Sequence, residues 1–130
     1  MIKTGILNPQ LISLLARVRH TNTLVIADRG FPFWPGVETV DLSLVDGVPT
    51  VPQVLEAIRA NFVIGDIRMA SQFLVHNTEE TKAAFARSLD GIPVTFEDHE
   101  DAFKPRVPRA IGIVRTGDTT QFANMILTSA

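Results

Sequence analysis

The run Thr23-Leu24-Val25-Ile26-Ala27 is short, continuously apolar and rich in β-branched residues, and it lies between the polar turn His20-Thr21-Asn22 and Asp28. Such a run is typical of a strand that is buried on both faces, as in parallel sheets covered by helices. The segment from Arg29 to Gly36 that follows is dense in Pro, Gly and aromatic residues, which predicts a loop. The chain is therefore expected to build an α/β fold around this strand.

Helical and strand-like segments alternate along the rest of the chain. Capping residues predict three helices, which begin after Asn8, Thr50 and Thr78. A short helix is expected at residues 99–104, ended by Pro105 and Pro108. Further strands are expected at residues 38–42, 62–70 (interrupted near Gly65), 93–97, 110–114 and 123–127. The alternation predicts a three-layer α/β/α sandwich with a mixed, largely parallel sheet, as a single domain over residues 1–130.

The composition excludes several classes of function. With 130 residues, 20% of them charged, the chain is long enough for one core and is not typical of a disordered protein. Twelve basic and fourteen acidic residues give a net charge of −2, which is no footprint for nucleic acid. No apolar run is long enough for a membrane span and no secretion signal is visible, so we expect a cytoplasmic protein. The absence of Cys removes thiolate catalysis and Cys-ligated metals.

Two kinds of cofactor site are weighed and disfavoured. Gly112 and Gly117 have the spacing of a P-loop, but Asp118 stands where the phosphate-binding Lys is needed. A metal site could use His99 with the carboxylates at 98, 100 and 101, yet none of the three His residues forms a helical i, i+4 pair with another. The acidic cluster is more economically the capped start of a solvated helix. We therefore expect neither a nucleotide nor a metal.

Acid–base chemistry without a cofactor is the remaining possibility. Asp28 follows the carboxyl end of the predicted strand, where open α/β sheets bind ligands. His20 precedes the same strand, so the two side chains should lie roughly 20 Å apart at about 3.3 Å per residue. They can share a site only if a second copy of the chain supplies His20 or if the short turn doubles back. The structural alternatives are a turn histidine bonded to the backbone and an Asp that caps a loop.

Three further features of the sequence need an interpretation. His76 precedes an exposed helix entry and is expected to be solvated. For Phe31, Phe33 and Trp34, packing in the core or between subunits is favoured over stacking on a ligand. Asn124 lies between apolar residues, so its amide needs either a structural partner or a polar ligand.

An ordered set of short segments resembles the family of D-ribose pyranases and L-fucose mutarotases over nearly the whole chain. The stretch Asp41-Leu42-Ser43-Leu44 with Gly47-Val48-Pro49 is more similar to the ribose branch than to the fucose branch. The segments that carry the resemblance are Arg19–Asp28, Gly30-Phe31-Pro32, Asp41–Pro49, Gln53-Val54-Leu55, His99 with Phe103-Lys104, Arg115-Thr116-Gly117-Asp118 and Phe122–Leu127.

The resemblance implies an isomerase that opens and recloses a monosaccharide ring by acid–base catalysis, with no cofactor. It implies that His20 is the general acid and that Asp28 and His99 bind the sugar together with the segment Phe122-Ala123-Asn124. Arg29 and Lys104 are further candidates for the pocket. The family also implies a ring of subunits, often a decamer, with each site at an interface between chains.

Two residues depart from the family pattern. Phe122 stands where the family usually has Tyr, and Arg29 stands where many relatives have Ala. The first change removes a hydroxyl from the site and the second adds a cation at its edge. These departures keep two alternatives open: a mutarotase for L-fucose or another aldose, and a sugar-binding relative without catalysis.

Overall fold

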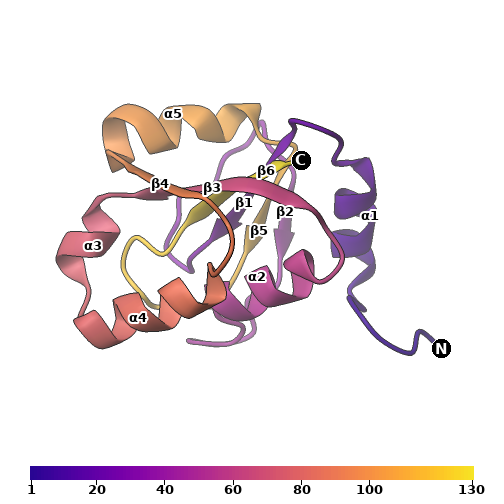
Figure 1. The fold of residues 1–130 in the computed structure, drawn as a ribbon. Coiled ribbons are helices and arrows are strands. Elements are labelled where there is room, and N and C mark those ends of the chain that lie inside the picture. Colours follow the sequence, from indigo (N-terminus) through magenta and orange to yellow (C-terminus); the bar gives the residue numbers. More distant parts are fainter.

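A computed structural model describes residues 1–130 and shows six strands in one sheet, with helices on both faces (Figure 1). The sheet has the strand order β2-β5-β1-β6-β3-β4. In chain order the elements are α1 (Pro9–Arg17), β1 (Thr23–Ala27), β2 (Thr39–Asp41), α2 (Val51–Arg59), β3 (Ile64–Ala70), α3 (Gln72–His76), α4 (Glu79–Ser88), β4 (Val94–Glu97), the π-helical turn η1 (His99–Phe103), α5 (Lys104–Arg106), the 3₁₀ turn η2 (Val107–Arg109), β5 (Gly112–Arg115) and β6 (Met125–Ser129).

The sheet is mixed and largely parallel, as predicted. β1 pairs in parallel with β5, β5 with β2, and β3 with β4. β6 alone runs the other way, antiparallel to both β1 and β3. Leu24 to Ala27 of β1 are fully buried, which confirms a strand covered on both faces.

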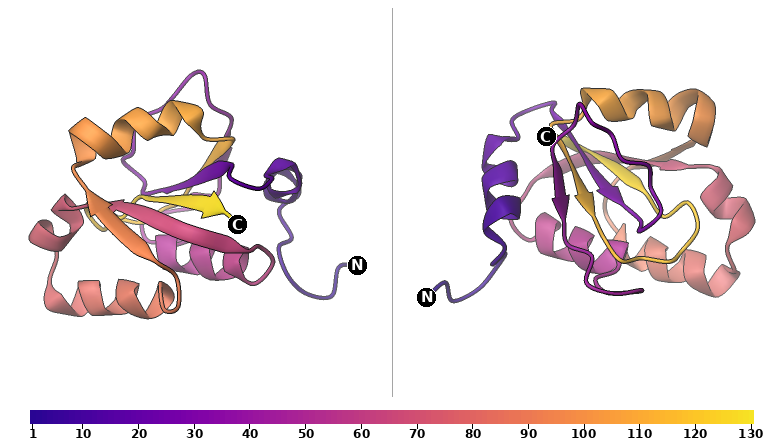
Figure 2. Two further views of the ribbon diagram at one scale, coloured as in Figure 1. Left: turned by 45° about the horizontal axis from the view of Figure 1, so that its top comes forward. Right: turned by 180° about the vertical axis from the view of Figure 1, so that it is seen from behind.

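Two apolar layers enclose the sheet. On one face, α1, α2, α3 and α4 contribute to an 18-residue cluster that includes Leu14, Leu55 and Phe73. On the other face, Phe103 of η1 and Val107 of η2 pack with Phe31 in a cluster of eight residues. Both views in Figure 2 show α5 on one side of the sheet and α2 and α4 on the other. The three-layer prediction is thus confirmed.

The predicted caps of three helices are confirmed. Asn8 Oδ1 accepts a hydrogen bond from Leu11 N at 2.9 Å, and Thr50 and Thr78 cap α2 and α4 in the same way. Asp98 likewise accepts from the backbone N–H groups of Glu100 and Asp101 at the start of η1. The capping side chains of these helices therefore accept hydrogen bonds from backbone amides.

The structure corrects the prediction that Pro105 and Pro108 end the helix that begins at His99. The helical path continues to Arg109, and its hydrogen bonding changes from π-helical to α-helical and then to 3₁₀ at the residue before each proline. Pro105 lies in the first turn of α5 and Pro108 in the first turn of η2, where a missing N–H costs no internal hydrogen bond. The five-residue helix α3 was not predicted, since Ser71 provides no side-chain cap and the helix is shorter than two turns.

The last two strands begin and end later than predicted. β5 runs from Gly112 to Arg115, and β6 runs from Met125 to Ser129. Ala123 and Asn124 stay outside β6, and Phe122 just before them has a positive φ of 54°. Thr128 and Ser129 extend β6 because they pair with Thr23 of β1 and Ile64 of β3.

Candidate functional site

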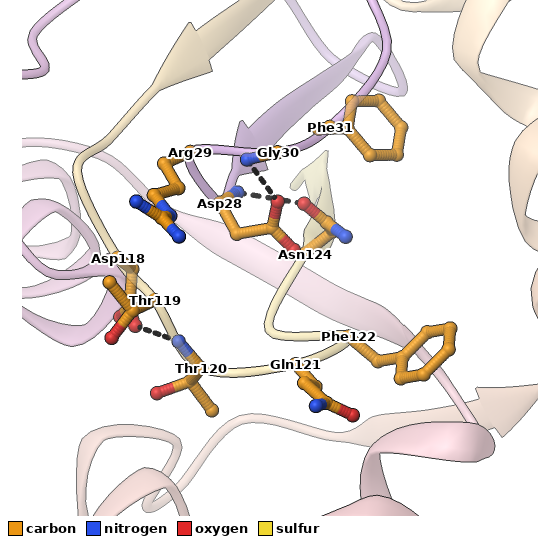
Figure 3. A pocket seen from close by; sticks show the side chains of 10 residues that line it. All are labelled: Asp28, Arg29, Gly30, Phe31, Asp118, Thr119, Thr120, Gln121, Phe122 and Asn124. Atoms are coloured by element: carbon orange, nitrogen blue, oxygen red, sulfur yellow. Dashed lines mark hydrogen bonds between the residues drawn. The ribbon is translucent and has the colours of Figure 1, made fainter. Parts of the chain in front are cut away.

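A cavity of about 390 Å³ opens at the carboxyl ends of β1 and β5. Two segments face each other across it, one following β1 and one connecting β5 to β6 (Figure 3). This is the edge of a parallel sheet at which α/β proteins bind ligands. The lining residues are Asp28, Arg29, Gly30, Phe31, Asp118, Thr119, Thr120, Gln121, Phe122 and Asn124.

Asp28 and Asn124 lie side by side at the centre of the cavity wall (Figure 3). Asn124 Oδ1 accepts a hydrogen bond from Asp28 N at 2.7 Å, and Asp28 Oδ1 accepts one from Gly30 N at 2.9 Å. Asn124 is buried, so this contact is the structural partner that its amide requires. The sequence pattern left open whether Asn124 serves the fold or a ligand, and the geometry allows both, since the residue also lines the cavity.

Burial raises the pKa of Asp28 above its ordinary value. Hydrogen bonds from Gly30, Asn124 and the backbone of Phe31 lower it, and the negative charge of Asp118 raises it a little further. The net shift makes this carboxyl group a better proton acceptor than a solvated Asp. A hydroxyl group in the cavity would meet an oxygen that both accepts hydrogen bonds and holds a proton more readily.

Asp118 holds the opposite wall in place. Its buried carboxylate accepts a hydrogen bond from Val51 N at the start of α2, at 2.8 Å, and another from Thr120 N at 2.8 Å. The positive end of α2 favours the negative charge there. The residue before it, Gly117, approaches the 45–48 loop so closely that a Cβ would lie 2.3 Å from the carbonyl oxygen of Val45.

The wall formed by residues 118–121 was not predicted as part of the site. The available signal was the run of turn-forming residues Thr116-Gly117-Asp118-Thr119-Thr120 directly after a parallel strand. Polar loops at that position are where α/β folds place ligand-binding groups. From the sequence, this run was considered as the end of a P-loop, which Asp118 disfavours, and as part of the family resemblance, but not as a wall of the site.

Aromatic side chains close the cavity on one side. Phe122 packs edge-on against His99, with ring centroids 5.1 Å apart, and His99 also stacks on Phe103. Phe31 lies in the same cluster, 6.5 Å from His99. Core packing, the favoured reading of the aromatic loop, is confirmed for Phe31, whereas Phe33 is exposed.

His99 is buried, and its Nδ1 has no hydrogen-bond partner. Burial lowers its pKa, and the positive charge of Lys104 lowers it further, against smaller opposing effects of Glu100, Asp28 and Asp98. The imidazole is therefore neutral at pH 7, with one N–H donor and one free acceptor. His99 does not line the cavity directly but supports two residues that do, Phe31 and Phe122.

His76 also reaches this cluster. Its side chain is exposed, as predicted, yet its ring packs on Phe122 with centroids 5.2 Å apart. The next residue, Asn77, donates a hydrogen bond from Nδ2 to the carbonyl oxygen of Gln121 at 2.9 Å. No sequence pattern predicted these contacts, because they join the end of α3 to a loop more than forty positions away.

The other candidate residues lie at the rim or outside the cavity. Arg29 lines the rim and forms an ion pair with Asp46 at 2.6 Å. Lys104 pairs with Glu100 at 2.7 Å, one turn away from His99, and does not line the cavity. Ala123 is buried in the larger apolar cluster.

The structure places His20 at the opposite end of β1 from Asp28. The turn that contains His20 is tied to the end of β6, since Thr21 N donates to Ser129 O and Ser129 N donates to Asn22 O. Asp28 is tied to Asn124, just before the start of β6. The turn therefore does not double back, and within one chain His20 and Asp28 stand at opposite ends of the sheet.

Neither a metal centre nor a membrane span is evident. No group of three His, Asp or Glu side chains lies in a geometry that could hold a metal ion. Asp98, which was weighed as a ligand beside His99, instead caps η1 and accepts a hydrogen bond from Gln72. No helix combines the length and the apolar character needed to cross a bilayer.

Comparison with known proteins gives similarity over the full chain. The sequence model of the RbsD / FucU transport protein family matches residues 1–130. A protein named D-ribose pyranase from Geobacillus thermodenitrificans is 40% identical over 129 residues, which is 99% of this chain and 96% of that protein. A second D-ribose pyranase, from Geobacillus kaustophilus, is 41% identical over 129 residues, 99% of this chain and 93% of that protein.

Two solved structures share the fold. The structure of Bacillus subtilis RbsD complexed with D-ribose superposes with a TM-score of 0.90 at 32% identity, covering 100% of this chain and 98% of that one. The fucose mutarotase of Streptococcus pneumoniae in complex with L-fucose has a TM-score of 0.79 at 23% identity, covering 95% of this chain and 92% of that one. The latter likeness concerns the fold alone.

Proposed function

Since the chain belongs to the RbsD/FucU family, we propose that it catalyses the interconversion of monosaccharide ring forms, with the pyranose and furanose forms of D-ribose as its substrate. The observation that carries this proposal is the polar cavity around Asp28 and Asn124. It occurs in a chain whose fold matches that of an RbsD that contains D-ribose. Relatives at 40% identity over the full length are named D-ribose pyranases, which supports the same substrate.

The residue chemistry suits the reaction. Opening a cyclic hemiacetal requires removal of a proton from the anomeric hydroxyl and delivery of a proton to the ring oxygen. Asp28 and Asn124 together offer carboxylate and amide oxygens and an amide N–H to sugar hydroxyls. We assign His20 as the general acid, since an imidazole side chain can take up and release a proton near neutral pH. Phe122 completes the sugar-binding wall, and His99 supports it from behind.

This assignment requires a second copy of the chain, because the His20 of one chain cannot reach its own Asp28. We propose a ring of subunits, a decamer by resemblance to the family, in which His20 of one chain meets the cavity of its neighbour. A head-to-tail contact of this kind closes into a ring when the rotation between neighbouring chains divides a full turn. Exposed apolar side chains in the two loops next to the cavity support coverage by a neighbouring chain: Phe33 follows the lining residue Phe31, and Leu44 and Val45 belong to the loop that packs against Gly117.

Magnetisation-transfer NMR on D-ribose tests the proposal. The protein should accelerate exchange between the pyranose and furanose signals, and L-fucose and other aldoses in the same panel should respond more weakly. Asp28→Asn should abolish the acceleration, whereas Asp90→Asn, at an exposed position two residues after the end of α4, should retain it. The absence of acceleration with every aldose in the panel would reject the proposal. Faster exchange of L-fucose than of D-ribose would instead assign a mutarotase of the fucose type.

One observation favours a second candidate, a sugar-binding protein without catalysis. Phe122 has no hydroxyl, so it can neither donate a hydrogen bond to a sugar nor transfer a proton. Calorimetry would then show monosaccharide binding while the exchange rates stay at their values in buffer. A large gain in exchange rate on Phe122→Tyr would show that the native cavity is catalytically reduced.

A further inference from the structure

We infer that His76 and Asn77, at the end of α3, are positioning residues that hold Phe122 against the cavity and thereby set the affinity for the sugar. The inference deepens the proposed function and rests on it. Neither residue lines the cavity. Both act through the loop of residues 119–122, which lines the cavity.

Asn77 fixes the backbone of this loop. Its Nδ2 donates one hydrogen bond to Gln121 O and another to Phe73 O within α3, both at 2.9 Å. Both hydrogens of one amide group thus connect the end of the helix to the residue just before Phe122. The link is specific, because only a side chain with two donors at this point joins both carbonyl groups.

Phe122 needs such a restraint because its backbone is in a costly conformation. Its φ of 54° lies in the left-handed region, which a bulky side chain rarely occupies. Conformations of this kind persist where surrounding contacts over-determine them. The hydrogen bond to Gln121 O restrains the residue before it, and the buried Ala123 and Asn124 restrain the residues after it.

The ring of Phe122 is held between two imidazoles. His76 packs on it at 5.2 Å with an interplanar angle of 34°, and His99 meets it at 5.1 Å and 82°. His99 is buried among Phe31, Phe103 and Phe122, while His76 is exposed and forms no hydrogen bond that would hold it elsewhere. Removing His76 therefore frees one side of Phe122 and lets its ring turn away from the cavity. On this inference His76 acts through the face of its ring, which a phenyl ring at position 76 would also supply.

Four variants of the full-length protein test the inference: His76→Ala, His76→Phe, Asn77→Ala and the control Val75→Ala, an exposed residue of the same helix. We expect His76→Ala and Asn77→Ala each to raise the KM for D-ribose about three- to tenfold, the size of one lost hydrogen bond or packing contact. The kcat should change by less than about twofold. His76→Phe and Val75→Ala should keep the wild-type KM, and His76→Phe should keep the wild-type pH profile.

Two results would overturn the inference. One is an unchanged KM in both His76→Ala and Asn77→Ala. The other is a His76→Phe variant as impaired as His76→Ala with an altered pH profile, which would make His76 a proton-transfer group.

NMR separates this inference from the proposed function. If the wild-type protein neither binds nor isomerises any aldose, the proposed function fails. The positioning role is then decided by the amide signals of residues 119–122. Shifts or broadening of these signals in Asn77→Ala and His76→Ala, but not in Val75→Ala, support it, and unchanged signals reject it.

Discussion

Two ionisable side chains of the site, Asp28 and His99, have pKa values shifted in opposite directions by one cause. Burial raises the pKa of the carboxyl and lowers that of the imidazole, so each is pushed toward its neutral form. Hydrogen bonds from Gly30 and Asn124 keep the shift of Asp28 in check. At the scale of the residue, the cavity therefore favours a carboxyl group that takes up a proton readily beside an uncharged histidine.

The raised pKa of Asp28 has a consequence for stability. The folded state binds this proton more tightly than the unfolded state. Protonated Asp28 therefore contributes fully to the free energy of unfolding at pH values below the ordinary pKa of Asp, and this contribution is lost as the pH rises through the raised pKa of the folded state. Asp28→Asn, which keeps the acceptor for Gly30 N, should therefore raise the free energy of unfolding at pH 7 by up to about 1 kcal/mol. The gain should shrink toward pH 4, and isomerisation should be lost.

Denaturant unfolding at several pH values measures this effect. The exposed control Asp90→Asn should match the wild type throughout. A variant Asp28→Asn that is less stable than the wild type at pH 7 and equal to it at pH 4 would contradict the assigned direction of the pKa shift.

At the scale of the element, local sequence signals were sufficient to predict a helix wherever a capping residue or a periodic apolar face was present. Asn8, Thr50 and Thr78 were identified from side-chain chemistry alone, and each caps its helix. α3 and the path through Pro105 lacked such signals. Both depend on tertiary contacts: Asn77 anchors α3 to the loop before β6, and Phe103 and Val107 bury the 99–109 segment on the sheet.

The connection between β5 and β6 makes a prediction about Gly117. A Cβ at this position would lie 2.3 Å from Val45 O, 2.6 Å from Val48 O and 3.0 Å from Val48 N. These are backbone atoms that cannot rotate away, so Gly117→Ala should lower the free energy of unfolding by about 2 kcal/mol or more. It should also weaken sugar binding, because the adjacent Asp118 positions Thr120 at the cavity.

Thermal unfolding with Gly36→Ala as the control checks this expectation. A Cβ at Gly36 meets no atom within 4 Å, so that variant should stay within about 0.5 kcal/mol of the wild type. Equal stability of the Gly117→Ala variant and the wild type would show that the 45–48 loop moves freely and does not fix the cavity wall.

At the scale of the whole molecule, the topology predicted where the cavity lies, but it did not predict all the residues that form the site. A buried strand followed by Asp28 predicted a site at the carboxyl end of a parallel sheet, and the cavity lies there. The polar wall at residues 118–121 could not be placed, because it depends on the pairing of β5 with β1. His20 and Asp28 lie at opposite ends of β1, as the length of the strand predicted. A single chain therefore cannot show whether His20 acts at the cavity of a second copy.

Mixing two inactive variants tests whether His20 of one chain acts at the cavity of another. His20→Ala and Asp28→Asn each remove one half of a site that, on our proposal, spans two chains. When equal amounts are unfolded together and refolded, random assembly joins a chain that retains His20 to the cavity of a chain that retains Asp28 at about one contact in four. Each such site has both groups, so the mixture should recover about a quarter of the wild-type exchange rate on D-ribose, while each variant refolded alone stays at background. If both groups acted within one chain, no mixture could restore activity, because every chain would still lack one of them; a refolded mixture at background would therefore reject the shared site.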